Sequence, residues 1–144
     1  MVESDGTEPI DDDELLYRRA PVSTGWYSES GLSPEAFDPR PDEHTGISIY
    51  RAKYKSLDEV AKGRGKKGYF VAIFRAGNLR QQGIEVAPCP NTPEGHDPAH
   101  AELPGLTALN RDSNSALEQR LALSTLAIDV KGPFVATPTN EAFG

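Results

Sequence analysis

The stretch Gly68–Cys89, GYFVAIFRAGNLRQQGIEVAPC, decides the fold of this 144-residue chain, because two apolar runs follow each other in it across a short connector. Residues 69–74 are apolar on both faces and rich in aromatic and β-branched side chains, which is typical of a strand covered on both sides. Residues 79–82 can form about one helical turn, which Gly83 can end in a left-handed conformation. Ile84–Ala87 predicts a second strand, which the following prolines end. The connector is short for a parallel crossover, so the two strands should be antiparallel neighbours or not adjacent.

Local patterns on both sides of this stretch predict the other elements. We expect a short strand or helical turn at Leu15–Arg19, a helix start at Ser33–Phe37, a period-two strand at Ile47–Ala52, a capping box at Ser56–Glu59 that opens a helix to about Lys62, a strand at Ala99–Leu103, and a helix capped by Asp112 or Ser113 that runs to about Ile128.

These elements predict an α+β fold, with one small domain that contains a mixed, mostly antiparallel sheet of about four strands and two or three helices. We place this domain at residues 15–130. Residues 1–14 should be a disordered acidic tail, and residues 131–144 a C-terminal tail.

The net charge of −7 is unevenly placed, since residues 1–14 hold seven of the 22 acids and no base. The remaining residues carry 15 acids and 15 bases and are neutral. The acidic stretch therefore either keeps the chain solvated or lies against a basic surface, its own or a partner's.

The composition also limits the compartment. No run of 18 apolar residues predicts a membrane span, and the acidic start is unlike a signal peptide. The single cysteine, Cys89, excludes an internal disulfide and indicates a reducing compartment. We expect a cytoplasmic protein without a cofactor.

Residues 96–100, HDPAH, are the first candidate for chemistry. His100 could act as a general base oriented by Asp97 or by Glu102. Cys89 would need a histidine nearby to become a nucleophile. The spacing of His96 and His100 suits a metal on a helix face, but Pro98 between them makes a helix unfavourable, so we predict no metal site and a buried structural role for His100 as the simpler interpretation.

Residues 51–67 are the second candidate, with seven bases against two acids. The letters GRGKKG at 63–68 match a nucleotide-binding glycine pattern, but a predicted helix precedes them and a strand follows, which reverses the required context. A solvated basic turn is the simpler interpretation. The alternative is contact with nucleic-acid phosphates through four bases, namely Lys62, Arg64, Lys66 and Lys67.

Three motifs carry a resemblance: Leu16-Tyr17-Arg18-Arg19, Gly68-Tyr69-Phe70-Val71-Ala72 and Asp97-Pro98-Ala99-His100-Ala101. In these the chain resembles a set of small bacterial proteins that share an arginine pair near the start, a central Gly-aromatic-x-Val-Ala strand and a Pro-Ala-His-Ala segment. The set has no established activity, so the resemblance implies a stand-alone bacterial domain and no particular chemistry. Many of these proteins end in a helix rich in Arg and Lys, whereas the helix expected here has only Arg120.

The sequence favours a non-enzymatic interaction or accessory module over an enzyme, because it contains no coherent catalytic set. In the helix predicted at 112–128, Leu117, Leu121 and Ile128 lie on one side and Leu123 lies nearly opposite, which indicates a helix that is buried or covered by a partner. We expect a protein partner or self-association through this helix. A small hydrolase or nuclease using His100 and Asp97, and a nucleic-acid-contacting domain, remain alternatives.

Overall fold

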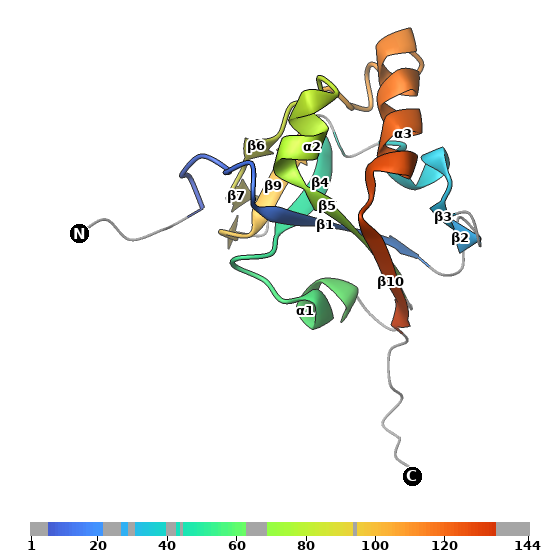
Figure 1. The fold of residues 1–144 in the computed structure, drawn as a ribbon. Coiled ribbons are helices and arrows are strands. Elements are labelled where there is room, and N and C mark those ends of the chain that lie inside the picture. The colour runs from blue at the N-terminus through green and yellow to red at the C-terminus, as the bar shows by residue number, and fades with distance from the viewer. Residues whose placement is uncertain are drawn as a thin grey trace.

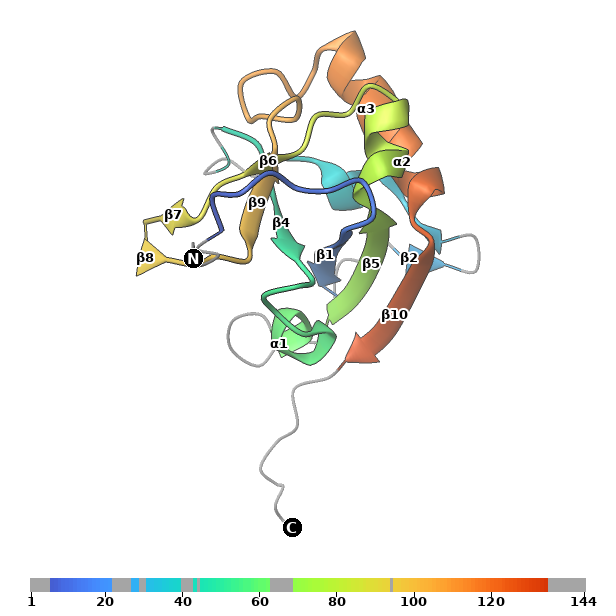
Figure 2. The ribbon, with the colours of Figure 1, turned by 60° about the vertical axis from the view of Figure 1, so that its left-hand side comes forward.

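A six-stranded sheet forms the centre of the molecule. The computed structural model describes residues 6–21, 27–28, 31–39, 43, 45–62, 69–93 and 95–134. The strands of the sheet are β1 (Leu15–Pro21), β4 (Ile47–Arg51), β5 (Tyr69–Arg75), β6 (Ala87–Pro88), β9 (His100–Leu103) and β10 (Asp129–Phe134). They lie in the order β10-β5-β1-β4-β9-β6, and Figure 2 shows β1 and β4 in the middle with β10 at one margin.

Every strand pair in the described part of the chain is antiparallel. Two further pairs stand outside the main sheet: β2 (Tyr27–Ser28) with β3 (Gly31–Leu32), and β7 (Asn91–Thr92) with β8 (Gly95–His96). The predicted α+β class with a mostly antiparallel sheet is confirmed. The sheet has six strands where we expected about four.

Helices cover both faces of the sheet. Helix α1 (Leu57–Lys62) lies on one side, and α2 (Ala76–Gln81) and α3 (Asn114–Leu126) lie on the other (Figure 1). The larger core lies under α2, α3 and the 3-10 helix η2 (Pro34–Phe37), and the smaller core lies under α1. The larger core includes Leu16, Phe37, Phe74, Leu79 and Leu123. No helix in the described residues is long and apolar enough to span a membrane.

Strand β5 is covered on both faces, as its composition predicts. Phe74 belongs to the larger core, whereas Val71 packs with Val60 and Ala61 of α1 on the opposite face. Strands β5 and β6 lie far apart in the sheet, which is the second of the two arrangements that the short connector allowed. The strand predicted at 84–87 overlaps the observed one only at Ala87. Strand β6 comprises Ala87–Pro88, which pair with Glu102 and Ala101 of β9, so Pro88 lies within the strand where we expected the prolines to end it.

Local signals for helix ends are confirmed in the structure. Ser56 and Glu59 exchange the two hydrogen bonds of a capping box, with N···O distances of 3.0 and 3.2 Å. Ser113 caps α3 by accepting a hydrogen bond from the backbone N–H of Ala116 at 3.1 Å. Gly83 follows α2 with a φ of 76°, the left-handed conformation expected there.

Both predicted domain boundaries need correction within the described residues. Residues 6–14 pack on the domain and bury Ile10 in the larger core. Residues 129–134 form β10, which pairs with β5. Composition alone suggested tails at both ends, but a single apolar anchor and a row of backbone hydrogen bonds are enough to attach polar segments.

Candidate functional site

The residues around His100 are positioned by the pairing of three strands. His100 and Glu102 lie two residues apart on β9 and therefore point to the same face. Across β4, Tyr50 pairs with His100 and Ser48 pairs with Glu102. On the other side, the backbone N–H of Cys89 donates to the carbonyl of His100 at 3.0 Å. The pairing thus gathers a thiol, an imidazole, a hydroxyl and a carboxylate on one face.

The imidazole of His100 is held by both ring nitrogens. Nδ1 lies 2.7 Å from the backbone carbonyl oxygen of Cys89, and Nε2 lies 3.1 Å from Oγ of Ser48. Because a carbonyl can only accept, Nδ1 carries the proton, and in the neutral ring Nε2 has the free lone pair. The ring of Tyr50 packs edge-on at a centroid distance of 6.0 Å. The side chain is therefore fixed in tautomer and orientation.

Cys89, His100 and Glu102 form a cluster of three half-buried groups whose ligand atoms all lie within 4.8 Å of one another. Oγ1 of Thr45 donates to Oε1 of Glu102 at 2.7 Å and orients the carboxylate. Burial, together with the negative charge of Glu102 and a hydrogen bond to it, raises the pKa of the Cys89 thiol. The thiol is therefore protonated at neutral pH and is a poor nucleophile in this state. These three side chains could hold a metal ion.

The other half of the predicted catalytic pair lies elsewhere. Asp97 accepts a hydrogen bond from the backbone N–H of Ala99 at 3.0 Å and pairs with Nζ of Lys55 at 2.9 Å. His96 is exposed, with Nδ1 3.4 Å from the side-chain oxygen of Asn91. Asp97 thus shapes the entry to β9, and the structure gives no support for its orienting His100.

Sequence reasoning missed the partners that surround His100. It named Cys89 and Glu102 singly, but not Ser48 or Thr45. The signal was the period-two pattern of residues 47–52, which predicts side chains on alternate faces but not which strand pairs with them. The predicted nucleic-acid contacts fall on Arg64, Lys66, Lys67 and the side chain of Lys62, all outside the described residues.

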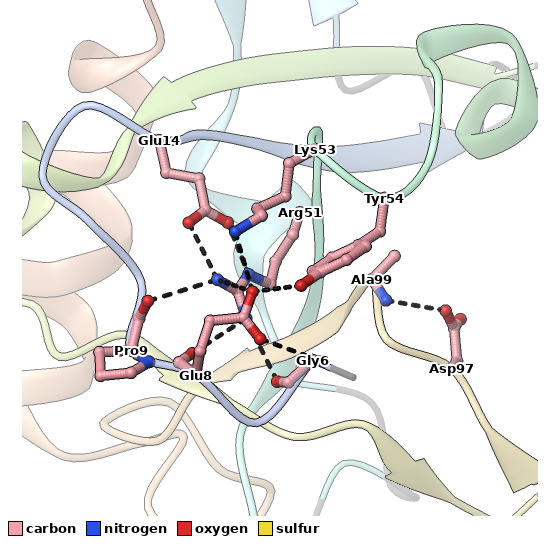
Figure 3. A network of polar contacts seen from close by, with 9 residues as sticks. All are labelled: Gly6, Glu8, Pro9, Glu14, Arg51, Lys53, Tyr54, Asp97 and Ala99. Atoms are coloured by element: carbon pink, nitrogen blue, oxygen red, sulfur yellow. Dashed lines mark hydrogen bonds and ion pairs between the residues drawn. The ribbon is translucent and has the colours of Figure 1, made fainter. Parts of the chain in front are cut away.

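A second polar cluster surrounds the fully buried side chain of Arg51 at the end of β4 (Figure 3). The carboxylate of Glu14 accepts a hydrogen bond from Nε of Arg51 at 2.5 Å and another from Nη2 at 3.0 Å. The guanidinium also donates to the carbonyl oxygens of Gly6 at 3.2 Å, Glu8 at 3.1 Å and Pro9 at 3.4 Å. Burial is the largest single influence and disfavours this charge, but the hydrogen bond with Glu14 and the negative charges of Glu14 and Glu8 together outweigh it and raise the pKa of Arg51.

Glu8 extends this network toward solvent. It accepts hydrogen bonds from Nζ of Lys53 at 2.8 Å and from the hydroxyl of Tyr54. These two bonds, the one from Lys53 first, lower the pKa of Glu8 from 4.5 to about 2. The acidic stretch therefore lies on basic side chains of its own domain, which is the second of the two roles considered for it.

Residues 11–14 also complete helix α2. The backbone N–H groups of Ala76 and Gly77 donate to the carbonyls of Glu14 and Asp12, at 3.0 and 2.8 Å. No side chain caps the start of this helix, so the segment supplies acceptors that a helix N-terminus otherwise lacks. We infer that the Arg51 cluster has a structural role, because its contacts join residues 6–14 to β4 and to the turn that follows this strand.

Helix α3 leaves one apolar side uncovered. Its inner side buries Ala116 and Leu123, whereas Leu117 and Leu121 are 44% and 59% exposed. All exposed large apolar side chains among the described residues lie between residues 109 and 128, and they are Leu109, Leu117, Leu121 and Ile128. Leu117 and Leu121 are one helical turn apart and so form a continuous apolar strip.

Comparison with known proteins gives no relative: no family model, no curated protein and no solved structure matches this chain.

Proposed function

We propose that this chain is a non-enzymatic protein-interaction module that binds a partner protein on the solvent side of α3. The observation that carries this proposal is the strip formed by Leu117 and Leu121 on a helix whose other side is packed in the core. Exposed apolar side chains gathered on one element mark contact surfaces more often than single scattered ones do. In the described residues all such side chains fall in this region.

The charges around the strip favour a partner with a basic rim. Asp112 and Glu118 are exposed near the strip, whereas Arg120 is buried and Arg111 is bound to Asp38. A second copy of the chain would bring the same acids to the interface, and it would also carry the net charge of −7. We therefore propose a different protein, apolar at the centre of its contact surface and basic at the edge.

The free thiol of Cys89 is in keeping with a reducing compartment, and we propose that the module works in the cytoplasm.

The test compares two variants, each of which carries two substitutions to serine. Leu117→Ser with Leu121→Ser removes the strip, and Gln81→Ser with Gln82→Ser changes exposed positions at the end of α2. A protein from the host that is captured by the wild type and by the glutamine variant, but not by the leucine variant, is then purified. Calorimetry should give binding roughly 10- to 100-fold weaker for the leucine variant. Full burial of one leucine contributes about 1.5–3 kcal/mol, and each of the two is only about half exposed before binding, so together they contribute about that amount.

Three results would contradict the proposal. Capture could yield no protein that depends on the leucines, or the purified partner could bind the leucine variant as well as the wild type. Light scattering could instead show a dimer of the chain that the leucine variant abolishes, which would assign the strip to a second copy. Unfolding in urea should show that the leucine variant is folded, because Leu117 and Leu121 lie on the solvent side of α3 and are not among the buried residues of the core.

A second candidate function is hydrolysis with His100 as general base. One observation favours it, the 3.1 Å hydrogen bond between Nε2 of His100 and Oγ of Ser48, which is the geometry of a base beside a nucleophile. Replacing Ser48 or His100 by alanine should then abolish turnover of ester or phosphodiester substrates, whereas Asp97→Ala should retain it. Equal turnover in wild type and Ser48→Ala would remove this candidate.

A further inference from the structure

The cluster of Cys89, His100 and Glu102 contains three kinds of metal ligand on one sheet face. Thiolate sulfur, imidazole nitrogen and carboxylate oxygen are the ligand types that Zn²⁺ takes in proteins. We propose that these three side chains bind a zinc ion. The inference is independent of the partner surface on α3. It keeps His100 of the His96–His100 spacing that the sequence analysis set aside, and it adds Cys89 and Glu102 in place of His96.

The strand geometry places the three ligands without a flexible loop. His100 and Glu102 share a face because they are two apart on β9, and the hydrogen bond from the N–H of Cys89 to the carbonyl of His100 fixes the third. Their ligand atoms lie within 4.8 Å of one another. In a tetrahedral zinc site such atoms are about 3.5 Å apart. Rotamer adjustments of about 1 Å would therefore be enough to close the site around an ion.

Two of the ligands already have the outer partners that metal ligands usually have. Nδ1–H of His100 donates to the carbonyl of Cys89 at 2.7 Å, which leaves the lone pair on Nε2. Thr45 donates to Glu102 at 2.7 Å. Hydrogen bonds of this kind fix the tautomer and orientation of a ligand before the ion arrives, and their loss commonly weakens metal binding 10- to 100-fold. Thr45 is therefore a positioning residue of the proposed site.

Binding would replace two existing contacts. The hydroxyl of Ser48, which lies 3.1 Å from Nε2, would give up its hydrogen bond to the ring. The thiol of Cys89 would lose its proton to solvent, and the positive charge of the ion would offset the carboxylate beside it. Ser48 thus competes with the ion for Nε2. This separates the zinc proposal from a catalytic Ser48–His100 pair, which requires the hydroxyl.

Only three residues make up the cluster within the described parts of the chain. A zinc ion there would keep its fourth position for water or for an incoming group, as in zinc sites that are not closed by a fourth side chain.

Cobalt titration of the full chain under reducing conditions tests the proposal. Co²⁺ bound to a thiolate absorbs in the near ultraviolet, and Cys89 is the only cysteine, so such a band must arise from this residue. The wild type should show the band, and Zn²⁺ should displace cobalt and give the zinc affinity by competition. Cys89→Ser should lose the band, and His100→Gln and Glu102→Gln should each bind at least 10-fold more weakly.

Matched controls separate this site from general metal binding. His96→Gln and Asp97→Asn change the nearby histidine and acid outside the cluster and should leave the affinity unchanged. Ser48→Ala should bind zinc as well as the wild type or more tightly. Thr45→Val should weaken zinc binding by about 10- to 100-fold. Zinc should also raise the unfolding temperature of the wild type but not of Cys89→Ser.

The proposal fails if the wild type shows no thiolate-to-cobalt band, or if Cys89→Ser binds zinc as tightly as the wild type. It also fails if His96→Gln weakens binding as much as His100→Gln does. Circular dichroism and the unfolding temperature of each variant without metal show whether it is folded. Should Glu102→Gln not fold, Thr45→Val tests the same carboxylate from outside the cluster.

Discussion

At the scale of single residues, Arg51 makes the structural contribution that is easiest to measure. Its side chain is completely buried, and its charge is balanced by Glu14, which is itself 7% exposed. Removing one partner of a buried ion pair leaves the other charge without compensation, which costs more than the pair contributes. Arg51 and Glu14 should therefore be tested together.

We expect Arg51→Met to lower the free energy of unfolding by about 3–5 kcal/mol, because Glu14 and the carbonyls of residues 6–9 lose their donors. Urea unfolding measures this. Arg51→Lys keeps the charge but not the two-point contact and should recover part of the loss. In the double variant Arg51→Met with Glu14→Gln, the loss in free energy of unfolding should be smaller than the sum of the losses in the two single variants. Full additivity would mean that the two side chains do not interact.

Glu8 should make stability depend on pH in the acid range. Its pKa is about 2 in the folded protein and near 4.5 when exposed. A carboxylate whose pKa is lowered by folding stabilises the protein above its unfolded pKa, and that contribution disappears as the pH falls from about 4.5 to about 2. Glu8→Gln should therefore reduce stability at pH 6 and have little effect at pH 2.

Urea unfolding of the wild type and Glu8→Gln at several pH values tests this dependence. Tyr54→Phe removes one of the two side-chain hydrogen bonds that lower the pKa of Glu8 and should give a smaller effect in the same pH range. A difference between wild type and Glu8→Gln that stays constant from pH 6 to pH 2 would contradict the lowered pKa.

At the scale of elements, the sequence predicts features that depend on neighbouring residues, but it does not predict which distant strands pair. The capping box at Ser56–Glu59 depends on residues three apart, so it is visible in the sequence. Strand β10 was missed because Asp129, Gly132 and Pro133 have low strand propensity, and its pairing with β5 decides its conformation.

The cap of α3 gives a prediction for one element. Ser113→Ala removes the acceptor for the N–H of Ala116 and should destabilise the protein by about 1 kcal/mol. Ser115→Ala, at an exposed position inside the helix, is the matched control and should be neutral or slightly stabilising. Equal effects of the two substitutions on the urea midpoint would show that Ser113 does not act as a cap.

At the scale of the whole molecule, charge is organised differently from what composition suggests. The acids near the start were predicted to form a solvated tail, yet Glu8, Asp12 and Glu14 bind Lys53, Arg80 and Arg51. The sequence contains both sets of charges but does not show which of them pair, because the bases lie far along the chain, in β4, in the turn that follows it and in α2. The same reason hid the cluster at Cys89, His100 and Glu102.

Removal of residues 1–13 tests whether this segment belongs to the domain. The deletion removes Ile10 and the carbonyl acceptors of Arg51 and Gly77, so it should destabilise the protein by several kcal/mol. Removal of residues 1–5 takes away none of the described contacts and serves as the control. If the longer deletion left the free energy of unfolding unchanged, the segment would be a tail and not a part of the domain.

The order of the strands bears on how the chain folds as it leaves the ribosome. Strand β1 is made first, yet it lies between β4 and β5. A nascent chain must reach Arg75 before β1 has both of its neighbours, and Phe134 before β5 is enclosed by β10. Contacts between distant parts of a sequence form slowly. Strand β1 therefore keeps one edge unpaired from the synthesis of Arg51 until Arg75 has been added.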